Sequence, residues 1–244
     1  MTVIAPDCTL ADLVTEIPAA ARVLDHLGLD YCCHGRERLD QACAARGVDL
    51  SVVMEELALL ATAPVPAPAW VGLAPVELVD HLEATHHVFL RAELPRLSEL
   101  AAKVSGVHGD RHAELVEVRS SFEALRGDLE PHLLKEERIL FPMIRELATS
   151  PTLPSFHCGS LGAPISVMLA EHDRAGELLG QLRGLTDGFR CPDDGCRSYR
   201  ALYDGLGQLE ADTHLHVYKE NHLLFPAVIA LELERSGVVG ESTV

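Results

Sequence analysis

Two matching segments lie 84 residues apart in this chain of 244 residues. The first, HLLKEERILFP, begins at His132, and the second, HVYKENHLLFP, begins at His216. Each segment places a glutamate four residues after its first histidine, at Glu136 and Glu220, and each ends in Leu-Phe-Pro. The two copies indicate one unit that occurs twice, which restricts the chain to folds in which two similar halves combine.

A single histidine precedes each segment at nearly the same interval. His87 lies 45 residues before His132, and His172 lies 44 residues before His216. Each unit therefore offers two imidazoles and one carboxylate, and the chain offers four imidazoles and two carboxylates. This inventory suits a pair of metal ions.

Apolar residues recur with helical periodicity in four long segments, at about 74–104, 110–148, 163–185 and 196–235. Strand-type alternation is nearly absent, and glycine and proline separate the segments. Four helices with short connections predict an all-α fold, an antiparallel four-helix bundle. Each predicted helix carries one element of the repeat, and residues four apart share a helix face, so these side chains can meet at the bundle axis. Pro142 and Pro226 are expected to kink their helices beyond the glutamates.

A proline-rich stretch, ATAPVPAPA at residues 61–69, excludes a helix and favours an extended linker. Before it, helical spacing occurs at residues 9–14, 19–27 and 50–60, with Gly28 and Gly47 as expected stops. We predict a small helical domain at 1–62, a linker at 63–72, the bundle at 73–236 and a flexible tail at 237–244.

The charge and the N-terminus exclude several classes of function. With 37 acidic and 20 basic residues the net charge is −17, so nucleic acid and anionic membrane surfaces are poor partners. The first residues, MTVIAPDC, lack the basic and apolar regions of a secretory signal, and no apolar run reaches the roughly 18 residues of a membrane span. We expect a cytoplasmic protein. Seven cysteines, an odd number, do not form a disulfide framework and are expected to be thiols.

The donor set restricts the choice of metal. Imidazole and carboxylate suit iron, manganese or zinc, but structural zinc usually recruits thiolates, and no cysteine falls within the repeat. Two glutamates bridging two ions, with two histidines on each ion, leave room for an oxo or hydroxo bridge and for one labile position. Nearby acids are candidates for hydrogen bonds to the ligands, with plain surface acids as the alternative: Asp128, Glu171, Asp173 and Asp212.

Three blocks carry a resemblance to a known family: HLLKEERILFPMI, APISVMLAEHDRAGEL and HVYKENHLLFP, together with DYCCHG at residues 30–35. The chain resembles the iron-sulfur cluster repair di-iron proteins, the RIC family of hemerythrin-like proteins. The resemblance implies a hemerythrin-like bundle with two non-haem iron ions, use under nitrosative and oxidative stress, and a homodimer. It also implies six metal ligands, with both glutamates bridging: His87, His132, Glu136, His172, His216 and Glu220. His86 is the alternative to His87 on the first helix.

Oxygen carriage is disfavoured by the ligand pattern. Oxygen-carrying hemerythrins use a second histidine on the third helix, whereas here Met168 and Gly176 lie four residues either side of His172. A less saturated centre is expected to exchange its iron more readily, which fits donation better than reversible oxygen binding.

Several residues outside the repeat are candidates for chemistry. The adjacent Cys32 and Cys33 suggest a redox or iron-transfer role, with two small buried residues in a turn as the alternative. Cys191 and Cys196 flank a Pro-Asp-Asp-Gly loop and could form a disulfide, bind metal or be plain surface thiols. We interpret His108 and His112 as a surface pair.

The leading hypothesis is a protein that is not an enzyme and that supplies iron to damaged iron-sulfur proteins, its clients. The alternatives are a di-iron enzyme that reduces nitric oxide and a sensor that responds to nitric oxide or oxygen. No nucleotide or flavin motif is visible, so a reductive enzyme would need an external electron donor.

Overall fold

The computed structural model describes residues 4–62 and 68–237. Within these ranges the chain is helical, and its only β-type pairings are two isolated bridges. The predicted all-α class is confirmed. Residues 63–67 of the predicted linker and 238–244 of the predicted tail lie outside the described residues.

Four short helices form the N-terminal part: α1 (Leu10–Glu16), α2 (Ala20–Leu27), α3 (Leu39–Arg46) and α4 (Leu50–Thr62). Thr9 caps α1 by accepting the Asp12 N–H at 3.1 Å. Gly28 and Gly47 end α2 and α3 with φ of 67° and 66°, a left-handed conformation that favours glycine. Helix α3 was not predicted, because its sequence LDQACAAR lacks a clear apolar stripe.

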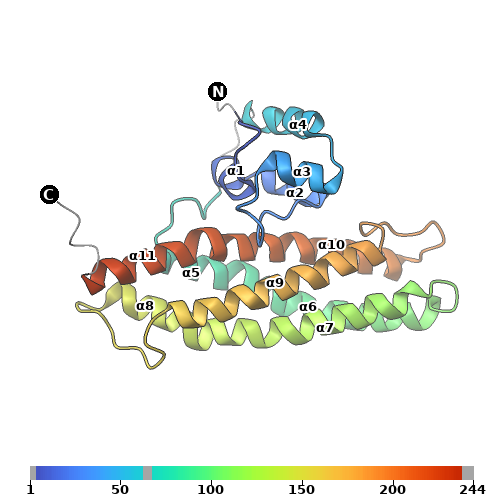
Figure 1. Ribbon diagram of the computed structural model, residues 1–244. Helices are drawn as coiled ribbons and strands as arrows, with labels where there is room; N and C mark the ends of the chain where they lie inside the picture. The colour runs from blue at the N-terminus through green and yellow to red at the C-terminus, as the bar shows by residue number, and fades with distance from the viewer. Residues whose placement is uncertain (1–3, 63–67, 238–244) are drawn as a thin grey trace.

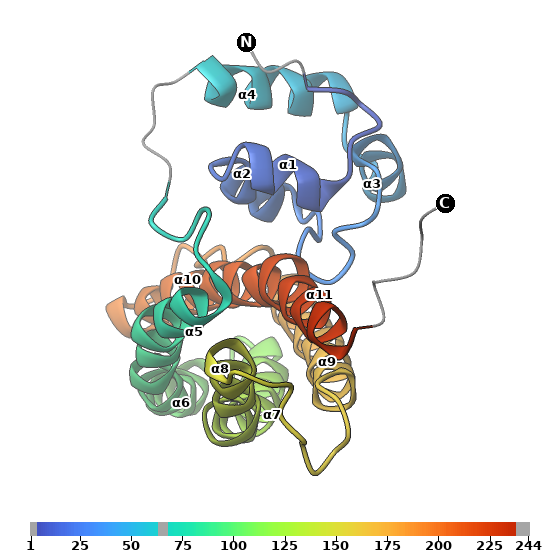
Figure 2. The same ribbon diagram turned by 90° about the vertical axis from the view of Figure 1, so that its left-hand side faces the viewer.

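The bundle contains four long helical rods. The first comprises α5 (Pro75–Leu82), η1 (Glu83–His87) and α6 (Val88–His108), and the second α7 (Glu114–Lys135), η2 (Glu136–Leu140) and α8 (Phe141–Thr149). The third is α9 (Gly162–Leu185). The fourth comprises α10 (Arg197–Tyr218), η3 (Lys219–Leu224) and α11 (Phe225–Ser236). The N-terminal helices lie on the side of the bundle formed by α10 and α11 (Figures 1 and 2).

Three of these elements, η1, η2 and η3, are π-helical turns, and each carries a residue of the predicted site. The Phe141 N–H bonds the Glu136 carbonyl, and the Phe225 N–H bonds the Glu220 carbonyl. The prolines that follow have no N–H with which to continue an α-helical ladder. The distortion expected beyond the glutamates therefore begins at the glutamates themselves.

The apolar interior consists of two clusters. One joins the N-terminal helices to the part of the bundle that holds Phe141, Tyr218 and Phe225. The other fills the remainder of the bundle around Phe122 and Tyr203. Tyr218 connects the two parts of the chain, because its hydroxyl lies 2.6 Å from the Thr15 hydroxyl and donates to the Ala11 carbonyl at 3.2 Å.

Candidate metal centre

Six side chains of the repeat converge inside the bundle from all four rods. His87 ends η1, His132 lies in the last turn of α7 and His172 lies within α9. Glu136 opens η2, while His216 and Glu220 come from α10 and η3. None of the six is more than 3% exposed, although each is a polar residue. Burial of so many polar groups in one layer requires partners for them.

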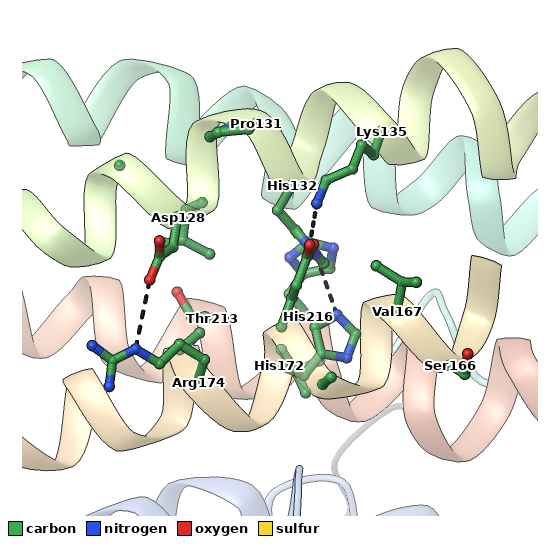
Figure 3. Close-up of a pocket in the computed structure, with 16 residues that line it drawn as sticks. Asp128, Pro131, His132, Lys135, Ser166, Val167, His172, Arg174, Thr213 and His216 are labelled. Atoms are coloured by element: carbon green, nitrogen blue, oxygen red, sulfur yellow. Dashed lines mark hydrogen bonds and ion pairs between the residues drawn. The ribbon is translucent and has the colours of Figure 1, made fainter. Parts of the chain in front are cut away.

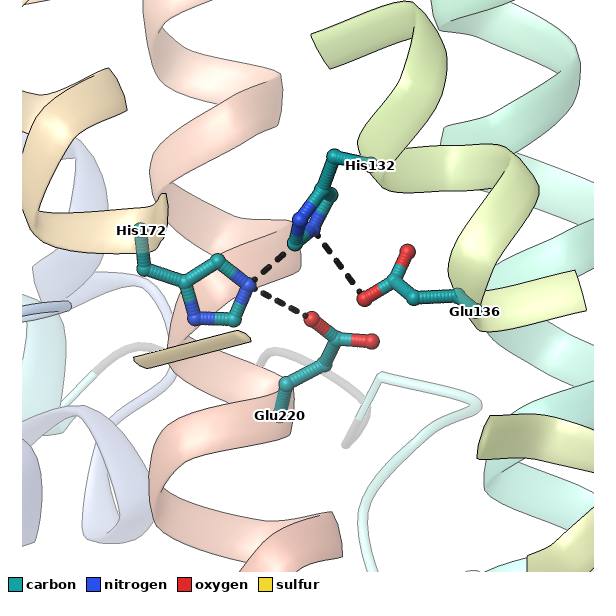
Figure 4. A group of neighbouring side chains, drawn as sticks. All are labelled: His132, Glu136, His172 and Glu220. Atoms are coloured by element: carbon teal, nitrogen blue, oxygen red, sulfur yellow. Dashed lines mark hydrogen bonds and ion pairs between the residues drawn. The ribbon is translucent and has the colours of Figure 1, made fainter. Parts of the chain in front are cut away.

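One half of the cluster pairs two histidines with both glutamates (Figure 4). His132 Nε2 lies 3.1 Å from Glu136 Oε1, and His172 Nε2 lies 3.1 Å from Glu220 Oε2. The two imidazole Nε2 atoms are 3.2 Å apart. These four side chains each offer a donor atom within 4.8 Å of the others.

The other half uses the remaining two histidines. His87 Nε2 lies 3.3 Å from Glu136 Oε2, and His216 Nε2 lies 3.5 Å from Glu220 Oε1. Each glutamate therefore directs one oxygen to one histidine pair and its second oxygen to the other pair. Such an arrangement matches two cations bridged by two carboxylates.

Most of the facing carboxylate and imidazole atoms lack hydrogen-bond partners, which bears on whether they suit metal ions. Both oxygens of Glu136, both oxygens of Glu220 and the Nε2 atoms of His87 and His216 are buried without a hydrogen-bond partner. Imidazole nitrogens lie within 3.5 Å of these carboxylates but do not satisfy their hydrogen-bonding capacity, which costs stability in a buried site, whereas a bound cation would satisfy it. Imidazole nitrogen and carboxylate oxygen are ligands that iron accepts, so the residues fit the group.

The carboxylates favour the charged form that binds metal. Burial alone would raise the pKa of Glu136, but the facing imidazoles, His132 first among them, outweigh burial and hold that pKa well below its usual value. His132 is also buried, yet Glu136 raises its pKa to about 9. The cluster is therefore electrostatically organised around two anionic carboxylates.

The Nδ1 atoms of three of the histidines form hydrogen bonds with neighbouring side chains. His132 Nδ1 lies 2.9 Å from Glu171, His87 Nδ1 lies 2.8 Å from Glu137, and His172 Nδ1 lies 2.8 Å from Asn221. A hydrogen bond at Nδ1 leaves Nε2 free to face a metal and fixes the orientation of the ring.

Of the four acids considered from the sequence, one contacts a histidine of the six. Glu171 bonds His132, whereas Asp212 bonds His86 at 2.9 Å and Asp128 faces Arg174 at 3.8 Å. Asp173 lines a groove beside Cys33. Sequence reasoning missed Glu137 and Asn221, although both directly follow the repeated glutamates and are themselves 84 residues apart.

His86, the alternative on the first rod, has different partners. Its Nε2 lies 2.7 Å from the buried Lys219 ammonium, and its ring stacks on His216 with centroids 5.2 Å apart. Burial lowers the pKa of Lys219 to about 8. The structure thus brings His87 into the cluster and directs His86 to Lys219.

A cavity of about 590 Å³ leads to the cluster between α7 and α9 (Figure 3). His132, His172 and His216 form part of its wall, and Ser166, Val167 and Ala170 form another part. Two ion pairs that connect α7 and α9 border it: Lys135 with Glu171, and Asp128 with Arg174. The cluster is therefore accessible to a small species.

The double cysteine lies against the same layer of the bundle. The Cys33 thiol lies 3.6 Å from the His172 carbonyl, and the Asn221 amide donates to the Cys32 carbonyl at 3.1 Å. The two sulfur atoms are 3.7 Å apart. The hydrogen bond with Cys33, burial and the Asp30 charge raise the pKa of Cys32 well above its usual value. Asn221 therefore contacts both a histidine of the cluster and the double-cysteine loop.

The interpretation of His108 and His112 as a surface pair is wrong for His108. That residue is 5% exposed and packs on Tyr199, with ring centroids 5.3 Å apart. Its Nε2 lies 3.2 Å from the Cys196 sulfur. The error arose because packing between α6 and α10 decides the burial of a helix end.

None of the helices that the structure describes combines the length and the hydropathy that crossing a bilayer requires.

Comparison with known proteins assigns both parts of the chain. Residues 78–228 match the hemerythrin HHE cation binding domain, and residues 6–61 match a domain of unknown function, DUF542. The chain is 36% identical to the iron-sulfur cluster repair protein YtfE of Enterobacter sp. (strain 638), over 93% of this chain and 98% of that protein. It is 35% identical, with the same coverage, to the YtfE protein of Escherichia coli O8 (strain IAI1).

These similarities extend over both parts of the chain and agree with the buried histidine and glutamate cluster. The family predicted from the sequence is confirmed. The chain belongs to the hemerythrin-like iron-sulfur cluster repair protein family.

Proposed function

We propose that this protein repairs damaged iron-sulfur clusters by supplying iron from a two-ion centre inside the bundle. The observation that carries the proposal is the placement of Glu136 and Glu220, each with one oxygen toward each histidine pair. His132 and His172 would hold one ion, His87 and His216 the other, and both glutamates would bridge. Iron bound there would supply exchangeable cations with accessible redox states.

The double cysteine is the proposed acceptor of iron on its way to a client. Cys32, Cys33 and Asp30 place donor atoms within 4.8 Å of one another, which suits a transient cation. Asn221 connects this loop to His172, so a change at the loop reaches a proposed ligand through two hydrogen bonds. The clients would be iron-sulfur proteins of the cytoplasm. The homodimer implied by the family is tested by light scattering.

The decisive experiment measures iron content and iron transfer. Purified protein is analysed for metal, then incubated with an iron-sulfur protein whose cluster nitric oxide has damaged. About two irons per chain and recovery of the client with loss of iron from this protein would support the proposal. Zinc in place of iron, or client recovery without iron transfer, would contradict it.

A double variant, Cys32→Ser with Cys33→Ser, tests the acceptor role. The expected result is an unchanged iron content together with loss of transfer. Cys158→Ser is the matched control, because Cys158 is exposed and lies on a loop that the proposal does not involve. Full transfer by the double variant would remove the cysteines from the proposal.

The cavity that reaches three of the histidines favours a second candidate, reduction or sensing of nitric oxide at the same centre. The double cysteine variant separates the two functions. Nitric oxide consumption that persists when client repair is lost would assign an enzymatic role to the bundle alone. Absence of nitric oxide consumption by the wild-type protein, with a supplied reductant, would eliminate this candidate.

A further inference from the structure

A second group of reactive side chains lies at one end of the bundle, outside the metal centre. The loop between α9 and α10 and the loop between α6 and α7 lie at the same end (Figure 1). The first loop carries Cys191 and ends at Cys196. His108 is the last residue of α6, and Arg111 lies in the second loop. Nothing in the proposed repair function uses these residues.

The contact between His108 and Cys196 joins a buried imidazole to an exposed thiol. His108 is 5% exposed, and its Nε2 lies 3.2 Å from the Cys196 sulfur. Cys196 itself is exposed to solvent. The Cys196 sulfur is thus accessible to small reagents from solvent and also contacts the buried His108 imidazole.

Arg111 determines which nitrogen of His108 carries the proton. Its guanidinium lies 3.3 Å from His108 Nδ1. Arginine can only donate hydrogen bonds, so Nδ1 must accept, and in the neutral ring the proton then resides on Nε2. The Nε2–H is consequently directed at the Cys196 sulfur, where it stabilises a thiolate more than a thiol.

The backbone reinforces this preference. Cys196 is the N-cap residue of α10, where free N–H groups favour negative charge. The amides of Tyr199 and Ser198, together with the charge of Lys103, lower the pKa of the Cys196 thiol. Burial and nearby acids raise the pKa of Cys191, so the two thiols differ in character.

Cys191 lies at the other end of the same short loop, with its sulfur beside Gly195. A tight turn, closed by the Gly195 N–H to the Pro192 carbonyl at 2.9 Å, brings the two ends of the loop together. The Cys191 sulfur lies so near Gly195 that a Cβ there would be only 2.5 Å from it. The residue next to Cys196 is therefore already in contact with the second sulfur.

We propose that Cys196 is a peroxide-reactive thiolate and that Cys191 converts its oxidised form to an intramolecular disulfide. In the first step the Cys196 thiolate attacks hydrogen peroxide, the O–O bond breaks, and sulfenic acid and hydroxide form. In the second step the Cys191 thiol attacks that sulfur, the S–O bond breaks, the S–S bond forms and water leaves. The two thiols lose two electrons, which peroxide receives.

Reactivity is tested on the full-length, iron-loaded protein with limiting iodoacetamide and peptide mass spectrometry. Cys158, also exposed but without an imidazole partner, is an internal reference. Cys196 is expected to be alkylated roughly threefold faster than Cys158 at pH 7, because greater thiolate content outweighs lower nucleophilicity. His108→Gln should reduce this advantage, leaving the part that the backbone amides supply, whereas His112→Gln, whose ring contacts Asp194 and Glu114, should retain all of it.

The second step is tested by mapping thiols after treatment with hydrogen peroxide. The wild-type protein should contain a Cys191 to Cys196 disulfide that dithiothreitol reverses. Cys191→Ser should instead accumulate sulfenic acid on Cys196, detected as a dimedone adduct. Equal alkylation of Cys196 and Cys158, or an oxidised Cys196 paired with any other cysteine, would overturn the proposal. Protection of both thiols by a bound metal ion would overturn it as well.

Discussion

At the scale of single residues, the proposed centre depends most on Glu136 and Glu220. Both are fully buried, and their oxygens have no hydrogen-bond partner. The repeat identified these residues, but their burial could not be derived from it. A histidine and a glutamate four residues apart have the same local spacing on a solvated helix face as in a bundle interior.

Replacing Glu136 with glutamine should reduce iron binding. The amide of glutamine has no anionic oxygen to bridge the ions held by the two histidine pairs. Glu136→Gln should therefore lower the iron content from about two ions to about one or fewer per chain. Elemental analysis measures this. Glu146→Gln, an exposed glutamate on α8, is the control and should retain all its iron. Full iron content in Glu136→Gln would contradict the bridging role.

Asp30 should stabilise the double-cysteine loop in a pH-dependent way. Burial opposes its charge, but hydrogen bonds from His34, the Cys33 amide and the Cys32 thiol lower its pKa to about 2. The folded-state pKa lies below the unfolded value of about 3.9, so the contribution is present above about pH 4 and disappears as the pH falls toward 2.

Asp30→Asn should therefore lower the free energy of unfolding by about 1 to 2 kcal/mol at pH 7, allowing for solvent screening of His34. The difference in the free energy of unfolding between Asp30→Asn and the wild-type protein should disappear as the pH falls from about 4 to about 2. Urea unfolding followed by circular dichroism measures it. Asp40→Asn, which removes a solvent-screened pair with Arg38, should leave the stability nearly unchanged. A difference in stability that does not change with pH would contradict the stabilising role of the ionised Asp30 carboxylate.

At the scale of elements, close contact between α6 and α10 depends on a glycine. A Cβ at Gly205 would lie 2.6 Å from the Leu97 Cδ2 atom and 2.8 Å from the Arg96 Nη2 atom. Arg96 can move into solvent, but Leu97 is fully buried and can move only by displacing its neighbours. The two helices therefore approach each other more closely than an alanine permits.

Gly205→Ala should lower the free energy of unfolding by about 1 kcal/mol or more, because the clash outweighs the higher helix propensity of alanine. Gly180→Ala is the matched control on α9, where a Cβ would meet nothing within 4 Å. It should raise stability by about 0.5 to 1 kcal/mol. Urea unfolding of both variants measures the difference, and stabilisation by both would disprove the close contact.

The bundle rods were predicted well because each is a long segment with a strong helical period. Predicted boundaries of 163–185 and 196–235 compare with Gly162–Leu185 and Arg197–Ser236. The π-helical turns were not predicted. They depend on which carbonyl each N–H reaches, and the prolines after Phe141 and Phe225 indicate only that the α-helical ladder must change nearby.

At the scale of the whole molecule, a layer of buried histidines and glutamates is enclosed within an apolar bundle. Under the proposed function, cations bound to this layer would stabilise it, and metal binding would then be coupled to folding.

Removing iron with a chelator should lower the melting temperature by about 5 °C or more. A ligand present at a hundredfold excess over its Kd stabilises the folded state by about 2.7 kcal/mol, and 1 kcal/mol corresponds to about 2–4 °C at this size. Differential scanning calorimetry of the iron-loaded and iron-free protein measures the shift. The double variant Glu136→Gln with Glu220→Gln should show no change in melting temperature on chelation. A change equal to that of the wild-type protein would mean that the stabilising iron binds elsewhere.

The sequence by itself determined the helical class, the family and five of the six candidate ligands, because periodicity, spacing and repeated blocks can be recognised along the chain without its fold. Only the tertiary structure decided that His87 rather than His86 enters the cluster, since adjacent helical residues point about 100° apart and packing selects between them. It alone also buried His108 against Cys196 and set Asn221 between His172 and the double cysteine. These contacts join residues distant in the chain, and their geometry follows from how the rods pack.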